Sequence, residues 1–515
     1  MPSRPKSTVE ETAWLSGGLN SNDPAHMISN NQSPDALNFD PSEPHGAVKR
    51  QGFSRWTVED PPAGHGGTFV SGLYGSTFTS GDRHILAAVG TRLYNLGDGS
   101  VTDWTDATPD LLSGTAITAD EPVRMIMFGD VICIFNPGGG PHKWVGGSGA
   151  PVAALEVAGS PPASPSTKID NAKGAALHKQ RLFAWGVPAT PSRMYWCAAG
   201  VPTDWSTEDN AGSEDIFIDD GSVINGIQSS GDVLWISKKS ANSAGTEGAI
   251  YGWFGNTPST STIKPIAHFS ALSQEAMLNY DGVMIIASEE GVFSLSGRGI
   301  ALLSRDIQSE YLAIPNKATI CLGRYQNQVW MAYPASGSDN NRVLVLDMAL
   351  GRWSKYSGNG NIKVMANHPD GTLLTGRASG DILVDRQVHG QTDNWDGSDD
   401  DGSAINFYWS TPDLSFGDFS KDKVGKLFFV HAKDTGDYNV TMTRYLDGEL
   451  QTDSVAYSFS VQGTGNIDRV VERMVLPSGD RASKFIRFRL TNNTASQDIT
   501  LFGWSAFADI MDPTR

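Results

Sequence analysis

Three carboxylates that lie close together, Asp215, Asp219 and Asp220, have the residue type and spacing nearest to an acid–base pair. Two carboxylates that face one pocket are the groups that hydrolyse glycosidic bonds. Within residues 214–220 (EDIFIDD), however, these carboxylates are interspersed with apolar residues, which we interpret as a strand with one face in water. The repeated Ser-x-Asp-x-Gly-x-Thr-Trp turn typical of sialidases is not present. We therefore interpret these carboxylates as an exposed strand face and predict no catalytic residue.

A second acidic stretch, residues 391–402, resembles a calcium loop only superficially. If Gly402 takes the place of the obligatory glycine, Gly397 falls on the first ligand position and Tyr408 on the last, where Glu is needed. The common hydrolase, zinc and phosphate-loop strings do not occur, and the ten histidines are scattered singly. The sequence thus predicts a solvated acidic linker, no metal, no cofactor and no enzymatic activity.

The three cysteines, Cys133, Cys197 and Cys321, are odd in number and far apart. Cys133 lies inside an apolar run, which is typical of a reduced, buried thiol. There is no apolar stretch at the N-terminus that could serve as a secretory signal, and no run of 18 apolar residues. We expect synthesis in a reducing cytoplasm and no membrane-spanning segment.

The net charge is −18, and the acidity is spread along the chain. Residues 1–69 carry −3, residues 70–390 carry −8 and residues 391–515 carry −7. A protein that grips nucleic acid needs clustered Lys and Arg to offset the phosphates. Tight DNA binding is therefore not expected.

A pattern of about fifty residues recurs in the middle of the chain: an apolar strand, a tight polar turn, and a second apolar strand. The turns fall near positions 82, 130, 180, 232, 282, 327 and 381, at spacings of 45 to 54 residues. Gly and Asp suit such turns, and units of four strands at this period are typical of propeller blades. We predict an all-β chain with a seven-bladed β-propeller over residues 70–390. Six blades, or an ordinary multi-sheet β protein, are the alternatives.

The second strands of these hairpins should form the core, because they are continuous apolar runs. The residues expected to be buried are Trp235, Ile236, Ile285, Ile286, Val329 and Trp330. One short helix is expected over residues 304–312.

The two ends of the chain differ from the middle. Residues 1–69 are rich in Asn, Ser, Pro and Gly and predict an extended arm that is ordered by packing. Beyond the linker, residues 403–515 contain alternating strands and predict an antiparallel β-sandwich.

Three strings in the arm resemble the opening of many phage tail proteins. They are Gly17-Gly18-Leu19-Asn20, then residues 33–40 (SPDALNFD), then residues 46–53 (GAVKRQGF). Downstream, residues 343–347 with Arg352-Trp353, residues 371–382, and Thr411-Pro412 before Phe416-Gly417 resemble the last blades and the trailing sandwich of the tail nozzles of short-tailed phages.

The resemblance implies a structural virion protein: a homohexameric ring at the tail tip, attached to the adaptor and portal and flanked by fibres or spikes. The genome would pass through it without tight binding, and an acidic wall agrees, because it repels the DNA backbone. A tail hub or head-to-tail connector is an alternative position for the same protein. We expect residues 33–39 and 48–53 to pack on the propeller or on a neighbouring subunit, with Arg50 buried and paired with a carboxylate.

Two other functions stay open. A receptor- or glycan-binding propeller of a spike or fibre would use aromatic side chains to stack on sugars, and the candidates are Trp104, Trp144, Trp205 and Trp353. Packing inside the blades is the simpler interpretation of these residues. A carbohydrate-degrading enzyme would have a suitable fold but lacks a recognisable constellation.

Overall fold

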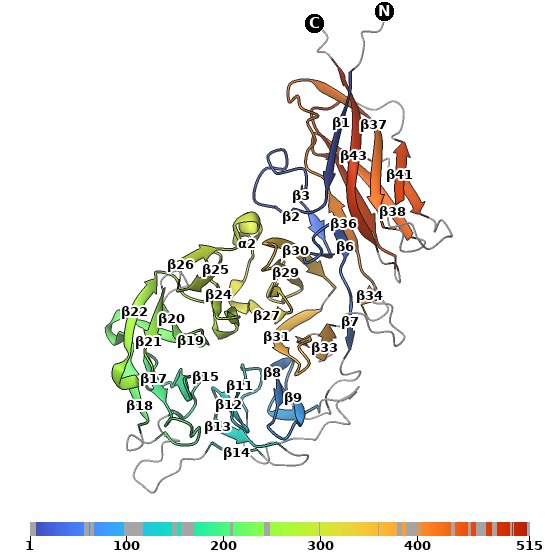
Figure 1. Cartoon of the computed structure of the whole chain (residues 1–515). Coiled ribbons are helices and arrows are strands. Elements are labelled where there is room, and N and C mark those ends of the chain that lie inside the picture. The colour runs from blue at the N-terminus through green and yellow to red at the C-terminus, as the bar shows by residue number, and fades with distance from the viewer. Residues whose placement is uncertain are drawn as a thin grey trace, which may run out of the picture.

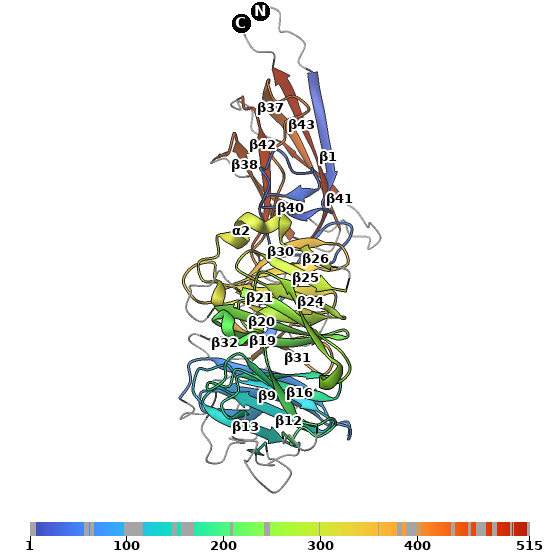
Figure 2. The same ribbon diagram turned by 90° about the vertical axis from the view of Figure 1, so that its left-hand side faces the viewer.

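The computed structural model consists of a propeller and a sandwich that form two lobes (Figures 1 and 2). It describes residues 7–55, 61, 66–96, 117–146, 152–155, 169–205, 210–240, 248–297, 299–358, 360–378, 384–387, 399–400, 403–433, 438–451, 455–459, 470–475, 482–494, 497 and 499–511. Strand β1 begins and strand β43 ends at the tip of the sandwich that is far from the propeller (Figure 1).

Seven sheets form the blades of the propeller, and in each the strands follow one another as an antiparallel meander. Blades 1 to 4 are β8 (Val70–Thr77), β9 (Arg83–Val89), β10 (Arg92–Asn95); β11 (Arg124–Phe128), β12 (Val131–Asn136), β13 (Gly139–Trp144), β14 (Ala153–Ala154); β15 (Gly174–His178), β16 (Arg181–Trp185), β17 (Arg193–Trp196), β18 (Gly212–Asp215); and β19 (Ser222–Ser230), β20 (Val233–Ser240), β21 (Gly248–Phe254), β22 (Thr262–Ala267).

Blades 5 to 7 are β23 (Met277–Tyr280), β24 (Val283–Ala287), β25 (Val292–Ser296), β26 (Gly299–Leu302); β27 (Cys321–Tyr325), β28 (Gln328–Tyr333), β29 (Arg342–Asp347), β30 (Arg352–Ser357); and β31 (Asn361–Asn367), β32 (Leu373–Ala378), β33 (Val384–Gln387), β7 (Phe53–Arg55). The first strand of each blade contacts the first strand of the next, and β31 contacts β8. The ring is therefore closed with seven blades, which confirms the predicted fold class.

The outer strand of blade 7 comes from the arm. β7 pairs antiparallel with β33, so that Arg55 lies opposite Asp385 and Phe53 opposite Gln387. A segment that precedes blade 1 in the sequence thus completes the last blade, which ties the two ends of the propeller together.

Six of the seven predicted turns connect the first two strands of a blade. The seventh is wrong: position 381 falls between β32 and β33, outside the described residues, whereas β31 and β32 are joined at Asp370-Gly371. There Gly371 has φ 89° and its N–H donates to the carbonyl oxygen of His368, so glycine supplies the left-handed backbone of the turn. The Ser-Gly-Asp string at 379–381 has the same sequence as other turns of the repeat, so the prediction selects it in place of Asp370-Gly371.

The sandwich is built from both ends of the chain. Its first sheet has the order β41 (Val470–Val475), β37 (Asp422–Ala432), β43 (Thr500–Met511), β6 (Ala47–Lys49), β5 (Phe39–Asp40), with β1 (Ser7–Trp14) also on β43. The second has the order β39 (Glu449–Leu450), β38 (Tyr438–Leu446), β42 (Ile486–Asn492), β36 (Phe407–Ser410), β4 (Ala36–Leu37), with β40 (Val455–Phe459) on β38. The arm therefore supplies strands to both sheets, beyond the packing that its composition predicted.

Two short strand pairs and several helical segments lie outside the blades and the sandwich sheets. β2 (Gly18–Leu19) and β3 (Gln32–Ser33) form a small parallel pair, and β34 (Asp399–Asp400) pairs with β35 (Ser403–Ala404). The predicted helix is found as η5 (Arg305–Ile307) followed by α2 (Gln308–Leu312), and the remaining helical turns are η2 (Ile218–Asp220), η3 (Pro258–Thr260), η4 (Gln274–Ala276) and η6 (Lys317–Thr319).

The predicted core residues are buried. Trp330 is the most informative, because its ring lies between those of Tyr325 and Tyr356 and its Nε1 donates to Gln328 Oε1 at 2.8 Å. The others predicted, Trp235, Ile236, Ile285, Ile286 and Val329, are at most 4% exposed. Burial in these second strands is therefore confirmed.

Candidate functional site

The carboxylates that resembled a catalytic pair do not share one strand face. Asp215 ends β18 and forms a two-pronged ion pair with Arg193 at 2.6 and 2.7 Å. Asp220 lies in the helical turn η2, where both of its oxygens accept from Lys238 Nζ at 2.9 Å. The prediction of a continuous strand through residue 220 is wrong, because contacts from β20 bend the chain at residue 217. Each of these two carboxylates is held by its own cation, which is an arrangement that stabilises structure.

Three of the tryptophans proposed as sugar platforms are buried. Trp144 is 0%, Trp205 3% and Trp353 2% exposed, so their rings have no face free to stack on a ligand. Trp104 lies outside the described residues, as does most of the acidic linker 391–402. In the part of the chain that is described, no cluster of His, Cys, Asp and Glu could hold a metal ion.

The three cysteines are free and buried, as predicted. Burial raises the pKa of Cys133 and of Cys321 to about 12, and that of Cys197 to about 11. The thiols are therefore protonated at neutral pH and unsuited to nucleophilic or metal chemistry.

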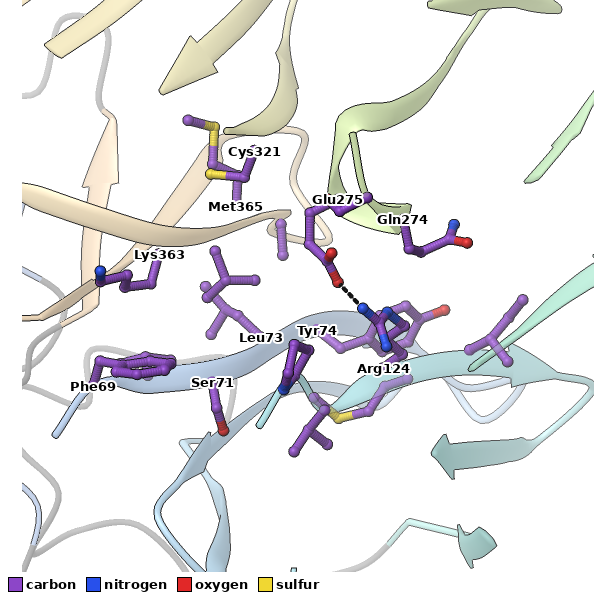
Figure 3. A pocket seen from close by; sticks show the side chains of 18 of the residues that line it. Phe69, Ser71, Leu73, Tyr74, Arg124, Gln274, Glu275, Cys321, Lys363 and Met365 are labelled. Atoms are coloured by element: carbon purple, nitrogen blue, oxygen red, sulfur yellow. Dashed lines mark ion pairs between the residues drawn. The ribbon is translucent and has the colours of Figure 1, made fainter. Parts of the chain in front are cut away.

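A cavity of about 700 Å³ lies where the inner strands of the propeller meet (Figure 3). The lining is mixed, with Phe69, Leu73 and Met365 among the apolar side chains and Gln274 among the polar ones. One ion pair crosses the cavity, from Arg124 Nη2 on β11 to Glu275 Oε1 in η4, at 2.5 Å. Blades 2 and 5 are thus bridged from opposite sides of the ring.

A second nitrogen of the Arg124 guanidinium and its face contact blade 3. Nη1 donates to the carbonyl oxygen of Lys173 at 2.6 Å, and Cζ lies 5.3 Å from the ring centre of Trp185. Glu275 is the one carboxylate among the described residues that line the cavity, and Arg124 neutralises it. A carboxylate pair for glycoside hydrolysis is therefore not assembled in this lining. Nothing in the sequence could have revealed the pair, because its members are 151 positions apart.

The arm motifs form the joint between the two lobes. Asn38, which has φ 58°, donates from Nδ2 to Ser357 Oγ of blade 6 and to the carbonyl oxygen of Asn406. Arg50, 2% exposed, donates to Asn38 Oδ1, to the carbonyl oxygen of Ser357 and to that of Gln51, and its Cζ lies 5.4 Å from the ring centre of Tyr356. The predicted burial of Arg50 is confirmed, and these partners are an amide oxygen and two carbonyl oxygens.

Two further arm residues tie the sandwich to the joint. Asp35 accepts from Arg489 Nη2 at 2.6 Å and from the hydroxyl of Tyr408 at 2.9 Å, and it lies 3.5 Å from Lys355 Nζ of blade 6. Lys49, 2% exposed, donates from Nζ to Asn492 Oδ1 and to two carbonyl oxygens of the sandwich, those of Thr494 and Gln497. A buried charged group is stable only when hydrogen-bond partners surround it, as they do here. The motif residues therefore have a structural role.

No protein-family model matches the sequence, and no curated protein matches it either. Among solved structures, the WD40 domain of Neurospora crassa Pan2 has 8% identity and a TM-score of 0.42, over 66% of this chain and 97% of that one. An oligogalacturonate lyase in complex with manganese has 10% identity and a TM-score of 0.36, over 67% and 98%.

Regucalcin from Agrobacterium tumefaciens, described as a calcium-binding protein, has 13% identity and a TM-score of 0.30, over 50% of this chain and 85% of that one. These similar structures are β-propellers, and some are enzymes; at such identities the likeness concerns the fold alone. Among the described helices, none has the length and apolar character needed to cross a membrane.

Proposed function

We propose that this chain is a structural subunit of the tail nozzle of a short-tailed bacteriophage. In this proposal identical copies, six by the resemblance, form a ring at the tail tip, joined to the adaptor and portal, beside fibres or spikes. The genome leaves through the ring, and the chain has no catalytic role.

The observation that carries the proposal is the position of the motif residues. The strings that resemble phage tail proteins contain Asn38, Lys49 and Arg50, and these three side chains make the buried polar contacts of the joint. A motif whose residues fix one lobe on another is what a family of assembly subunits would retain, because the relative position of the lobes sets the shape of each subunit in a ring.

The outer face of the first sandwich sheet supports a place in an assembly. β37 directs Phe428, Val430 and Ala432 into the core, while Leu427 and Phe429 lie on the opposite face, partly exposed. The Phe429 ring contacts Phe507 at 5.6 Å between centroids. Residues 427–430 of β37 are thus apolar on both faces, which is typical of strands covered on both sides, so this part of the face suits a contact with another subunit.

The charge of the chain suits a conduit for DNA. A net charge of −18 without a basic segment offers little attraction to phosphate, which allows a genome to slide past. This argument applies equally to a tail hub or connector, and the position in the particle separates these roles.

Electron cryomicroscopy of particles that carry a small tag on this chain tests the proposal. We expect tag density around the axis at the tail tip, with several copies in one ring. Density at the head–tail junction would indicate a connector, and density on peripheral spikes would indicate the receptor-binding alternative. Particles that lack the chain altogether would overturn the structural proposal.

A further inference from the structure

The connection between β18 and β19 contains an aromatic residue in a strained backbone conformation. Phe217 has φ 47° and ψ 67°, in the left-handed region. Most of the other non-glycine residues with positive φ are Asn, Asp or long polar residues in turns. A bulky side chain in this region is unfavourable, and such strain persists only where the surroundings enforce it.

The side chain that enforces it is a buried lysine of the neighbouring strand. Lys238 on β20 is 0% exposed, and its Nζ donates to the carbonyl oxygens of Ile216 at 2.5 Å and Phe217 at 2.7 Å, as well as to both oxygens of Asp220. Burial of an ammonium group is costly unless it is fully paired. The buried ammonium group of Lys238 therefore fixes the backbone conformation of residues 216–220.

The strain at Phe217 is not offset by burial. Phe416, the other aromatic residue with positive φ in the described part of the chain, is 2% exposed and belongs to the core. Phe217 is 50% exposed, with one face stacked on Tyr251 at 4.8 Å, and Ile218 beside it is 56% exposed. The hydrogen bonds from Lys238, which we call the lysine clamp, thus hold the apolar side chains of Phe217 and Ile218 exposed to water.

The residues that flank this pair are acidic. Glu214 and Asp215 precede it in the sequence, and Asp219 and Asp220 follow it. Arg193 pairs with Asp215 and the enclosed Lys238 pairs with Asp220, so four carboxylates stand against two cations and the segment keeps a net negative charge. From this geometry we propose that the loop is a preformed contact site that inserts Phe217 and Ile218 into an apolar socket, rimmed by Lys or Arg, on a different protein. A second copy of this chain does not suit the role, because its acidity is spread over the whole sequence. Complementary charge at the rim fits a basic protein surface and disfavours an anionic membrane. The proposal stands independently of the proposed function.

A stability measurement with purified protein tests whether the strain serves binding. Asn tolerates the left-handed region, so Phe217→Asn should leave the midpoint of thermal unfolding unchanged or raise it. Phe416→Asn is the matched control and should lower the midpoint by several degrees, because it removes a core side chain. If Phe217→Asn lowers the midpoint as much as Phe416→Asn does, the ring is needed for folding and the proposal fails.

Site-specific photo-crosslinking tests the partner. p-Benzoylphenylalanine replaces Phe217 in the full chain, produced together with the other proteins of its own genome, and the crosslinked peptides are identified by mass spectrometry. We expect one dominant peptide from a different protein, with apolar residues flanked by Lys or Arg, and a yield that falls several-fold between 50 and 500 mM NaCl. A dominant peptide from a second copy of this chain would contradict the proposal.

The same amino acid in place of Leu450, which is 59% exposed, gives the background. Capture no greater than this background, capture of lipid, scattered capture of unrelated chains, or a dominant peptide without basic residues would each overturn the proposal. Lys238→Met, which keeps both apolar side chains but removes the clamp, should reduce the dominant product at least fivefold.

Discussion

Arg50 holds Asn38 by two hydrogen bonds, one from its side chain and one from its backbone. Nε donates to Asn38 Oδ1 at 2.9 Å, and the N–H of Arg50 donates to the carbonyl oxygen of Asn38 at 2.8 Å. Asn38 Oδ1 also accepts from the N–H of Ser357, so the same amide oxygen links both arm motifs to blade 6.

Replacing Arg50 by Lys should therefore destabilise the protein strongly although the charge is kept. Lysine lacks the planar group that reaches Asn38 and Ser357 together and stacks on Tyr356. We expect a loss of roughly 2–4 kcal/mol in the free energy of unfolding, measured by chemical denaturation. Arg83→Lys, at an exposed position of blade 1, should change it by less than about 0.5 kcal/mol. Equal losses in the free energy of unfolding at Arg50 and Arg83 would contradict the structural role that we assign to Arg50 in the joint.

Truncation of Trp330 to Ala should cost about 3–5 kcal/mol, because it removes a buried ring between two tyrosines and leaves Gln328 without its donor. The comparison is Trp14→Ala, since Trp14 is 54% exposed. Denaturant unfolding of the two variants measures the difference. A cost at Trp330 no larger than that at Trp14 would mean that the hairpin core is not packed as described.

The stability of the protein should fall in mild acid through His178. Burial lowers the pKa of this imidazole to about 4, and its ring packs against Trp253. Between about pH 6.5 and pH 4 the unfolded chain binds a proton that the folded chain refuses, so the free energy of unfolding falls as the pH falls. We expect roughly 1–3 kcal/mol from this group.

Denaturation at pH 7 and pH 4.5 measures the effect. His178→Gln should lose less stability over this interval than the natural chain, whereas His26→Gln, at an exposed position, should follow the natural chain. Parallel losses in all three proteins would show that His178 does not cause the pH dependence.

Deletion of residues 1–45 should disrupt the sandwich, since it removes β1, β4 and β5. β7 is retained, so the propeller should still close. Limited proteolysis should then digest the sandwich while a propeller fragment persists, and the truncated chain should fail to enter particles. Normal incorporation would show that the arm is dispensable.

The isolated protein should show no measurable affinity for duplex DNA at about 150 mM salt, because phosphate binding requires clustered cations. Fluorescence anisotropy with a labelled duplex measures this. Binding with a steep salt dependence would contradict the weak attraction to phosphate on which the proposed conduit depends, and it would point to a basic surface that the charge count does not reveal.

The propeller could be predicted because its signal is local and repeated. Each hairpin places a short polar turn, often with Gly or Asp, between two apolar runs, and six of the seven turns predicted from these strings join the first two strands of a blade. The prediction misses the turn at Asp370-Gly371 because a Ser-Gly-Asp string that ends eleven residues later, at Asp381, also fits the period.

The joint and the loop at Phe217 could not be predicted in this way. The arm strands β2 to β5 are two residues long, too short to show a period of two. The bend at Phe217 depends on Lys238, a contact that no pattern within residues 214–220 contains. Sequence patterns identified residues that matter at both places, but their geometry comes from tertiary contacts.

The polypeptide crosses between the lobes twice. It passes from β6 of the sandwich to β7 of blade 7 within residues 50–52, and it returns from β33 of the same blade to β36. Two chain connections restrict the rotation of one lobe relative to the other more than a single linker would. A force applied to the sandwich therefore reaches the propeller through both connections to blade 7 and through the polar contacts of the joint with Ser357 and Lys355 of blade 6.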